Sequence, residues 1–498
     1  MTPEHIESVV DATSEGETFN TTVQHSRVES DDFVPVLYKR RWFVLGGYCL
    51  LSISSLSVWF AFSSISNITR KYYNIDMLQV SWIASVFSII PIVFMFPSNY
   101  FLKKKGLGLT IILAGFLNAF GSCIRYIGVS SSSYGYLFLL VGSVFCAVSI
   151  SAFLFLPAKI AALWFGEKER ATAVSIAISA DSVGLALGYF MPTAMVKNRS
   201  NISEIGDDLA NYLLAVAILA TLSFIYVTIT VRDKPKTAPS FSEAQKDVPA
   251  KDVLEIIEEN NHAEELISGN EPLPLTEIPS NAPIIVHQTD NESVFKRLLK
   301  NIHFQKILHL HGIIFGLESV YLIALNEMLI PQFPGHEFEV GLMGAVSLLL
   351  SVPSTYVIGL LIDKTRAYKK ITIGTTCLLT ILTSVLTTFF YLRLSFYSLF
   401  CTYMMIVIVF ATYYTTAFDH TAELTYPVSE AHSGVVLLWF AQLYSLVFGR
   451  TASYILVHSG ANVLMIFILI LNSFTFVISL FVKDKGPRGI LKAIDIQV

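Results

Sequence analysis

The sequence predicts an all-α membrane protein with twelve transmembrane helices in two pseudo-symmetric six-helix bundles. Hydrophobic residues make up 53% of the 498 residues and charged residues only 14%, whereas soluble domains carry about a quarter charged residues. Twelve apolar runs are each long enough to cross about 30 Å of hydrocarbon. One polar linker separates six runs from the other six, as in transporters built from two related halves.

The apolar runs divide the chain into an N-terminal bundle, residues 42–231, and a C-terminal bundle, residues 307–482. The fourth run is long enough to include an interfacial turn. The expected spans are 42–68, 78–101, 107–128, 134–164, 170–196, 209–231, 307–330, 341–362, 371–392, 395–418, 431–457 and 461–482.

Three polar regions flank the bundles. Residues 1–41 lack the basic-then-apolar order of a secretory signal, so we expect a disordered cytosolic N-terminus. Residues 232–306 contain twelve acidic residues between Glu243 and Glu292, a composition that cannot bury a core. We therefore predict an acidic disordered cytosolic linker there, and a cytosolic tail at 483–498.

Basic residues set the expected orientation, because Lys and Arg are retained on the cytosolic side. With both termini in the cytosol, 23 basic residues lie in cytosolic segments and six in outer segments. The six are Arg70, Lys71, Arg125, Lys197, Arg199 and Arg393. The glycosylation sequons at Asn67, Asn198 and Asn201 then face outward, which favours the plasma membrane.

Composition and motifs exclude several functions. A net charge of −4 argues against nucleic-acid binding. The five cysteines lie in apolar runs without metal-ligand spacing, and we expect neither a metal site nor a cofactor. No motif supports an enzyme. The expected partners are a small-molecule solute and the lipid bilayer, and we expect a monomer.

Polar side chains inside apolar spans indicate where a solute would bind. Burying them in a membrane is costly, so they face the bundle interior or a water-filled path. The candidate substrate-binding residues are Trp59, Asp181, Ser182, Glu318, Ser319, Tyr321 and Gln442.

Trp59 and Tyr321 lie in the first span of each half. Aromatic faces attract cations by up to about 2 kcal/mol in a dry site, so the two rings suit an ammonium ligand. Trp59 lies too deep for an interfacial anchor, which favours a cavity. For Tyr321, ordinary helix packing is the alternative.

Asp181 and Glu318 lie within spans five and seven. A carboxyl group there is either protonated and coupled to transport, or meets a cationic ligand. The structural alternative is a pair with Arg450 or a helix hydroxyl. Asp181 and Gln442 each follow a glutamate by twelve residues, so they are either symmetry-related across the two halves or alike by coincidence.

His309 and His311 lie at the cytosolic mouth of span seven. They would bind iron or haem if both faced the transport path. The alternative is that the two histidines are solvated.

Several segments carry a family resemblance, the most specific of them between spans ten and eleven. They are 38–42, 59 with 63–68, 163–166, 368–370, 423–430 and 441–442. In these segments the chain resembles the major facilitator superfamily. Within it, the chain is similar to the feline leukaemia virus subgroup C receptor-related proteins, whose members are linked to choline, ethanolamine and haem transport.

The resemblance implies a ligand site of a tryptophan in helix one, a tyrosine in helix seven and glutamines in helices five and eleven. Trp59 matches the tryptophan and Gln442 the helix-eleven glutamine. Ser182 replaces the other glutamine, and Ser319 stands where the tyrosine is expected. Tyr321 is two residues, or about 200° around the helix, from that position.

The resemblance also implies conformational roles for loop residues on the cytosolic side. Asp363 and Arg366 match the superfamily's loop pattern after span eight, and Glu423 and Glu430 bound the specific segment before span eleven.

The combined prediction is an alternating-access transporter of a small organic solute, with a choline- or ethanolamine-like amine as the leading substrate. A haem or porphyrin transporter is the alternative. A non-transporting solute receptor or scaffold is the alternative from another class.

Overall fold

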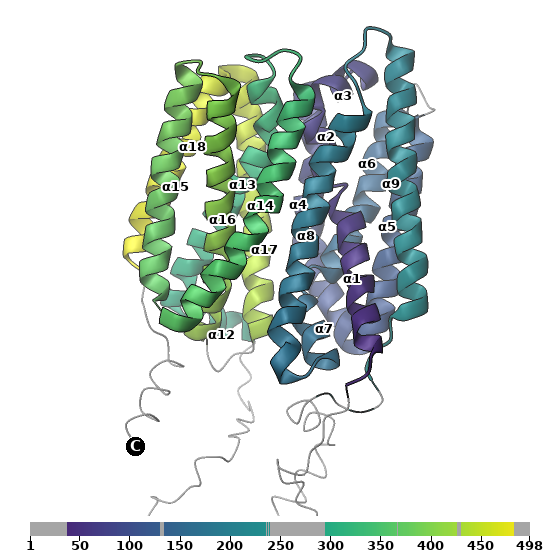
Figure 1. Cartoon of the computed structure of the whole chain (residues 1–498), viewed down its shortest axis with the longest axis vertical. Coiled ribbons are helices and arrows are strands. Elements are labelled where there is room, and N and C mark those ends of the chain that lie inside the picture. The colour runs from purple at the N-terminus through teal and green to yellow at the C-terminus, as the bar shows by residue number, and fades with distance from the viewer. Residues whose placement is uncertain are drawn as a thin grey trace, which may run out of the picture.

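The computed structural model describes residues 37–129, 134–235, 237, 239, 294–365, 367–425 and 430–482. In these ranges all regular secondary structure is helical. Figure 1 shows two upright helical bundles standing side by side. We call the end at the top of Figure 1 the upper end and the opposite end the lower end. Most of the predicted N-terminal region, linker and tail lies outside the described residues.

The N-terminal bundle is drawn in purple to teal in Figure 1. Its helices are α1 (Arg40–Leu56), α2 (Ala61–Ser64), α3 (Ser66–Tyr73), α4 (Met77–Lys105), α5 (Leu107–Val129), α6 (Gly135–Phe153), α7 (Pro157–Trp164), α8 (Glu167–Met195) and α9 (Ile202–Thr230).

The C-terminal bundle is drawn in green to yellow in Figure 1. Its helices are α12 (Val294–Lys300), α13 (Ile302–Leu329), α14 (Glu337–Thr365), α15 (Tyr368–Tyr391), α16 (Phe396–Thr425), α17 (Glu430–Ser459) and α18 (Ala461–Leu480).

The prediction of twelve crossings is confirmed, although the first crossing is not one straight helix. Eleven of the described helices are long and apolar enough to span a membrane. The span predicted at 42–68 is divided into α1, a turn at 57–60, α2 and α3. The interfacial turn expected within 134–164 is present, because α6 ends at Phe153 and α7 begins at Pro157.

Several predicted boundaries are wrong, among them the end of the tenth span, which was expected at 418 although α16 continues to Thr425. Residues 294–306 were assigned to the linker, yet α12 and the first turn of α13 lie there. The sixth span was expected from 209, but α9 begins at Ile202 with two polar turns. Hydropathy locates the part of a helix that contacts hydrocarbon, and polar turns continue the helix beyond it.

Side-chain caps explain where several helices begin. The Asp76 carboxylate accepts a hydrogen bond from the backbone N–H of Gln79 at 2.6 Å. The side-chain oxygen of Gln79 accepts one from the backbone N–H of Asp76. This capping box starts α4. The Asn201 side chain caps α9 and the Asn301 side chain caps α13, each by accepting hydrogen bonds from backbone amides of the first turn.

Arg125, counted above among the outer basic residues, is not a loop residue. Arg125 lies in α5 and is fully buried. Its guanidinium carbon is 5.2 Å from the centroid of the Phe62 ring. The aromatic face therefore provides part of the environment that water would provide to an exposed arginine.

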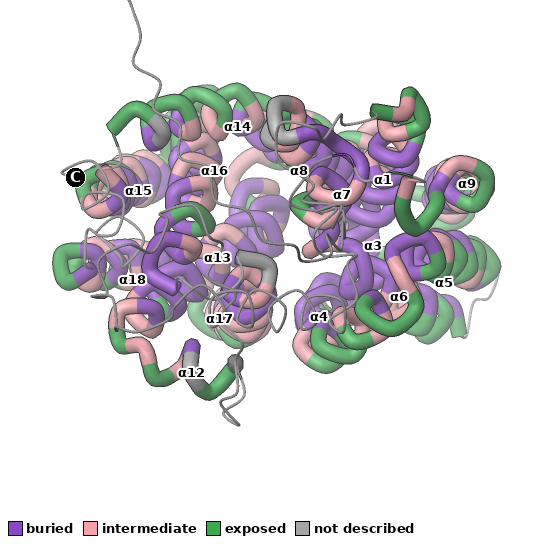
Figure 2. Tube along the Cα trace, turned by 90° about the horizontal axis from the view of Figure 1, so that it is seen from below, coloured by how far each residue is buried: buried purple, intermediate pink, exposed green. Residues whose placement is uncertain are grey.

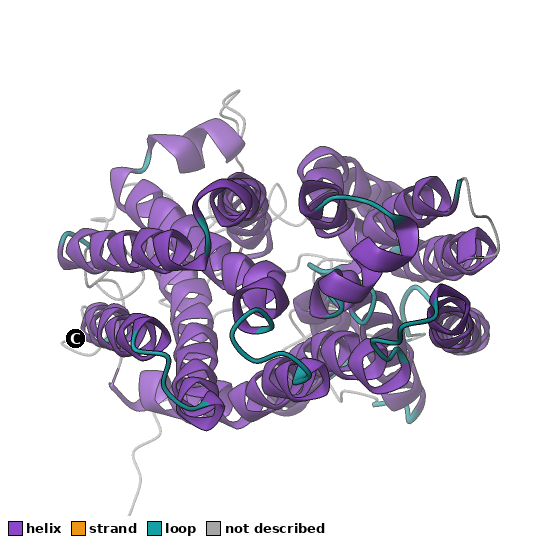
Figure 3. Ribbon diagram, turned by 90° about the horizontal axis from the view of Figure 1, so that it is seen from above, coloured by secondary structure: helices purple, strands orange, loops and turns teal. Residues whose placement is uncertain are grey.

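The most extensive contacts between the bundles run along two helix pairs, α8 with α14 and α4 with α17, and α13 also contacts α2 and α3. Figure 3 shows the two halves side by side from above. Figure 2 shows exposed residues on the outer sides of the peripheral helices and buried residues toward the centre. Among the candidate spans, α13 has the largest buried share. This burial places most side chains of α13 against other helices.

Candidate solute-binding site

Trp59 lies in the turn that interrupts the first crossing. Its ring stacks on Phe60 and on Phe87 of α4, with centroid distances of 5.1 and 6.0 Å, and the residue is only 5% exposed. The turn approaches α8 closely: a Cβ on Gly188 would lie 2.8 Å from the carbonyl oxygen of Ser57. A glycine in α8 therefore permits the position of this turn.

Gln442 lies in α17 and is fully buried. Neither its amide nitrogen nor its amide oxygen has a hydrogen-bond partner among the described residues. Burying an amide without a partner costs about 1–3 kcal/mol, so the group is available to a bound solute or water. Trp59 and Gln442 are both buried within the protein and do not face the lipid.

Asp181 of α8 is directed at α1. Its carboxylate accepts a short hydrogen bond from the Ser52 hydroxyl, and the buried Tyr48 hydroxyl is close enough to interact with it electrostatically. Ser182 follows it in α8 and is half-buried. The hydroxyl partner Ser52 was not predicted, because a serine in an apolar helix has no distinctive sequence signal.

Glu318 of α13 is directed at α16. The Tyr414 hydroxyl donates a short hydrogen bond to its carboxylate. Tyr414 was not among the predicted site residues, and only the tertiary contact identifies it.

Ser319 takes part in a chain of hydroxyl groups that crosses from one bundle to the other. The Ser445 hydroxyl of α17 donates to the Ser319 hydroxyl at 2.8 Å. Ser445 also lies 3.0 Å from the hydroxyl of Ser88 in α4. Ser319 is therefore one hydroxyl contact away from the interface between α17 and α4.

Tyr321 is directed away from this interface. Its hydroxyl lies 3.3 Å from that of Thr383 in α15, and its ring packs on Tyr403 and Phe410 of α16. It is 1% exposed. Two residues turn a helix by about 200°, which separates the directions of Ser319 and Tyr321. Tyr321 thus packs inside the C-terminal bundle.

Arg450 does not pair with either candidate carboxylate. Its guanidinium donates to the Ser81 hydroxyl at 2.6 Å and to the Leu78 carbonyl at 3.2 Å, both on α4. The same group lies 4.1 Å from the centroid of the Trp82 ring. Glu318 and Asp181 instead have the hydroxyl partners described above.

His309 and His311 do not converge. His309 is exposed, and its Nδ1 lies 2.9 Å from the Tyr444 hydroxyl of α17. His311 is buried and stacks on Tyr413 of α16, with ring centroids 6.0 Å apart. A shared iron or haem would need both rings on one side, and these rings face different helices.

At the upper end a set of polar contacts, here called the upper clasp, joins the bundles. The Asn326 amide of α13 donates to the Ser64 carbonyl at 2.8 Å and accepts from the Ser66 hydroxyl at 3.0 Å. Beside it, Arg70 of α3 and Glu327 of α13 form an ion pair at 3.6 Å. These contacts hold α2 and α3 against α13.

Two of the predicted glycosylation residues also belong to the upper clasp. Asn67 and Asn198 each donate an amide hydrogen to Oε1 of Glu337 in α14, at 3.3 and 3.1 Å. Asn67 is half-buried, whereas Asn198 and Asn201 are exposed.

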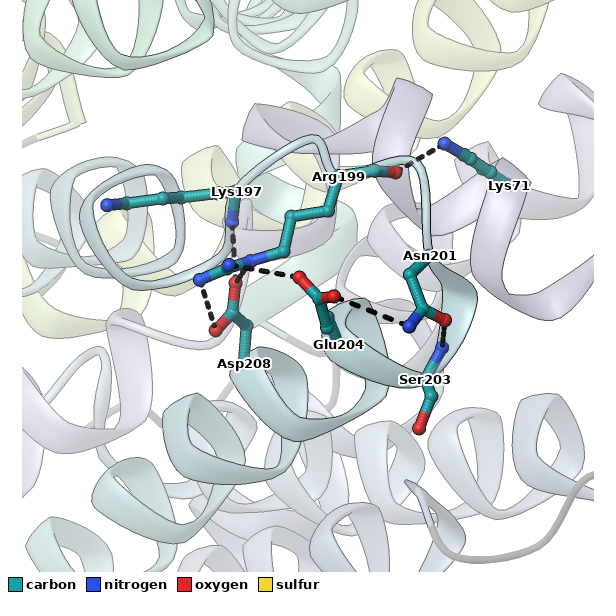
Figure 4. Close-up of polar contacts among 7 residues, drawn as sticks. All are labelled: Lys71, Lys197, Arg199, Asn201, Ser203, Glu204 and Asp208. Carbon is teal, nitrogen blue, oxygen red and sulfur yellow. Dashed lines mark hydrogen bonds and ion pairs between the residues drawn. The ribbon is translucent and has the colours of Figure 1, made fainter.

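Arg199 organises the loop that carries Asn198 and Asn201 (Figure 4). Its guanidinium donates to Asp208 at 3.0 Å and to Glu204 at 3.1 Å. Its hydrogen bond to Asp208 holds the pKa of the Arg199 guanidinium above its usual range. The loop is thereby fixed against the first turns of α9.

The predicted conformational residues are only partly within the described structure. Glu423 is buried near the lower end of α16. Arg366 and the side chains of Asp363 and Glu430 lie outside the described residues.

Known proteins are similar to this chain over most of its length. The model of the Major Facilitator Superfamily matches residues 47–449. The choline/ethanolamine transporter flvcr2a of Danio rerio is 26% identical over 455 residues, covering 91% of this chain and 88% of the relative. The choline/ethanolamine transporter FLVCR2 of Rattus norvegicus is 25% identical over 460 residues, covering 92% of this chain and 77% of the relative.

Solved structures show the same fold. A bacterial homologue of the human lysosomal transporter Spinster superposes with a TM-score of 0.66 at 13% identity, covering 91% of this chain and all of that one. A D-xylose-proton symporter superposes with a TM-score of 0.62 at 13% identity, covering 90% and 97%. The chain therefore belongs to the Major Facilitator Superfamily and, as its sequence resemblance indicated, is related to the feline leukaemia virus subgroup C receptor-related transporters.

Proposed function

We propose that the protein carries a small amine-bearing cation, such as choline or ethanolamine, across the plasma membrane by alternating access. The lower end, which holds the start of α1 and most of the basic residues, faces the cytosol. The upper clasp then closes the outer side of the solute path. The relatives named as choline/ethanolamine transporters support the substrate class.

The hydrogen-bond partners of two half-buried carboxylates, those of Asp181 and Glu318, carry this proposal. Among the described residues, Asp181 and Glu318 accept hydrogen bonds from the hydroxyl groups of Ser52 and Tyr414 and form no ion pair with lysine or arginine. A cationic solute between the bundles would offset their negative charge. Trp59 would supply an aromatic face, and the Gln442 amide would orient a hydroxyl group of the solute.

Uptake of radiolabelled choline and ethanolamine by cells that express the chain tests the proposal. We expect Trp59→Ala to lower kcat/KM by about tenfold or more, because an aromatic face contributes up to about 2 kcal/mol to binding a dry cation. Trp42→Ala is the matched control, since Trp42 is 43% exposed at the lower end of α1.

Three results would count against the proposal. Background uptake by the unaltered chain would exclude amine transport. Equal uptake by Trp59→Ala and Trp42→Ala would exclude the aromatic face. Amine binding without any flux would instead identify a receptor.

A further inference from the structure

A cavity of about 550 Å³ opens at the upper end, where the bundles meet. Its charged and amide side chains come from both bundles: Arg70 and Asp76 from the N-terminal one, and Glu327, Gln332 and Asn462 from the C-terminal one. We call this cavity the upper vestibule. The candidate solute-binding residues Trp59, Gln442, Asp181 and Glu318, which the proposed function places near the middle of the membrane, are not part of its described lining.

Glu327 brings an incompletely paired carboxylate to the upper vestibule. Its side chain is only 10% exposed, and its Oε1 has no hydrogen-bond partner within the described ranges. Its Oε2 lies 3.6 Å from the Arg70 guanidinium, which is an ion pair but too long for a hydrogen bond. A buried carboxylate that accepts so few hydrogen bonds favours a ligand that donates them.

Gln332 adds a second acceptor of the same kind. Its Oε1 is buried and has no partner among the residues that the structure describes. Asp76 adds a further negative charge, although its carboxylate also caps α4 and lies near enough to Arg450 for an electrostatic interaction. The upper vestibule thus offers acceptor oxygens with Arg70 as the one cation in its described lining.

The kind of acceptor selects among amines. A primary ammonium group carries three N–H donors, which can pair with the Glu327 carboxylate and the Gln332 carbonyl together. A quaternary ammonium group carries none and can offer only its hydroxyl group. The unpaired oxygens therefore favour ethanolamine over choline.

Arg70 and Glu327 also belong to the upper clasp. Arg70 is on α3 of one bundle and Glu327 on α13 of the other, beside the Asn326 contact. The Arg70 side chain is 45% exposed, so water can solvate it once it leaves Glu327. A ligand that takes its place would remove one contact between the bundles.

We propose that the upper vestibule binds a primary ammonium solute at Glu327 and Gln332, that this solute displaces Arg70 from Glu327, and that its binding weakens the upper clasp. The link to transport rests on the proposed function, whereas the binding site itself does not.

Equilibrium binding of radiolabelled ethanolamine and choline to the full-length protein in lipid nanodiscs tests the site. We expect Glu327→Gln to weaken ethanolamine binding by about tenfold or more, because a charge-assisted hydrogen bond is lost. Gln332→Leu, in the turn after α13, should weaken it in the same direction. Choline binding should change by less than about threefold.

The controls separate this site from the midplane. Glu339→Gln alters a carboxylate of α14 that is outside the lining of the upper vestibule, and it should leave the binding of ethanolamine and choline unchanged. Trp59→Ala should retain ethanolamine binding at the upper vestibule even where uptake is lost. Glu327→Asp keeps the charge and should restore part of the affinity if Glu327→Gln lowers it.

The proposal fails if Glu327→Gln and Gln332→Leu leave ethanolamine binding unchanged. It also fails if these substitutions weaken the binding of ethanolamine and choline equally. It also fails if Trp59→Ala abolishes all ethanolamine binding, since the midplane would then be the only site. Absence of uptake with vestibule binding intact would overturn the proposed function and leave this site standing.

Discussion

Gln442 and Tyr321 are almost equally buried but differ in what their polar atoms do. The Gln442 amide is unpaired within the described structure, whereas the Tyr321 hydroxyl meets Thr383 and its ring packs on α16. We expect Gln442→Leu to lower kcat/KM for amine uptake by about tenfold or more while leaving thermal stability unchanged or raised. The substitution removes an amide that has no hydrogen-bond partner in the folded protein but could hydrogen-bond to a bound solute.

Tyr321→Phe is the matched comparison for Gln442→Leu. It removes one hydroxyl contact inside the bundle and should cost about 0.5–1.5 kcal/mol of stability with normal uptake. Thermal unfolding of the purified proteins and uptake at several amine concentrations measure both effects. Normal uptake by Gln442→Leu would assign Gln442 to packing alone.

At the level of residues, sequence reasoning locates polar groups but not their partners. Trp59 and Gln442 were predicted from their position within apolar runs, and both are buried. Their roles remain predictions. The partners Ser52, Tyr414 and Ser445 follow only from how the helices face one another. A serine or tyrosine within an apolar span resembles many others that serve packing.

The contact between α1 and α8 depends on two glycines of α8. A Cβ on Gly184 would lie 3.0 Å from the Ile53 backbone, and one on Gly188 would lie 2.8 Å from the Ser57 carbonyl oxygen. We expect Gly188→Ala to destabilise the protein by about 1–3 kcal/mol, because backbone atoms cannot move aside as a side chain would. Uptake should fall with it, since the turn carrying Trp59 would shift.

Gly374→Ala in α15 is the control for this contact. Nothing lies within 4 Å of the Cβ that it would add, and Gly374 is exposed. It should be neutral or stabilise by about 0.4–1 kcal/mol. Melting temperatures of the two variants in one detergent provide the comparison. Equal melting temperatures would show that α8 can move away from α1 without cost.

The sequence predicted which helices are present more accurately than it predicted where each helix begins and ends. Hydropathy found every long helix, but it missed the polar start of α9 and the short α12. The break in the first crossing was also missed. Residues 57–60 are as apolar as their neighbours, and the reason for the turn includes its close approach to Gly188, which is distant in sequence.

The orientation of the whole molecule predicts where a glycan is attached. Asn201 is exposed at the upper end. Its Oδ1 caps α9, and its Nδ2, the atom that would be modified, donates to Glu204 at 3.3 Å. Asn67 is half-buried, and its Oδ1 is enclosed. We expect Asn201→Gln to abolish or reduce a glycosidase-sensitive mass shift and Asn67→Gln to leave it unchanged.

Electrophoresis before and after glycosidase treatment measures this shift in cells. Asn198→Gln belongs in the series, because Asn198 is also exposed although its amide contacts Glu337. A shift lost only in Asn67→Gln would mean that the upper clasp opens long enough for modification. A glycan traced to a residue at the lower end would reverse the proposed orientation.

For the molecule as a whole, the sequence by itself determined the class of protein, the twelve crossings and the division into two halves. These properties follow from the length and polarity of each run, because hydrocarbon requires every crossing segment to be apolar and internally hydrogen-bonded. The tertiary structure decided which polar side chains meet. In the tertiary structure the Tyr321 side chain packs inside the C-terminal bundle, His309 and His311 face different helices, and Glu327 lies beside Arg70. Such contacts depend on the rotation and spacing of helices far apart in the chain, which local composition does not encode.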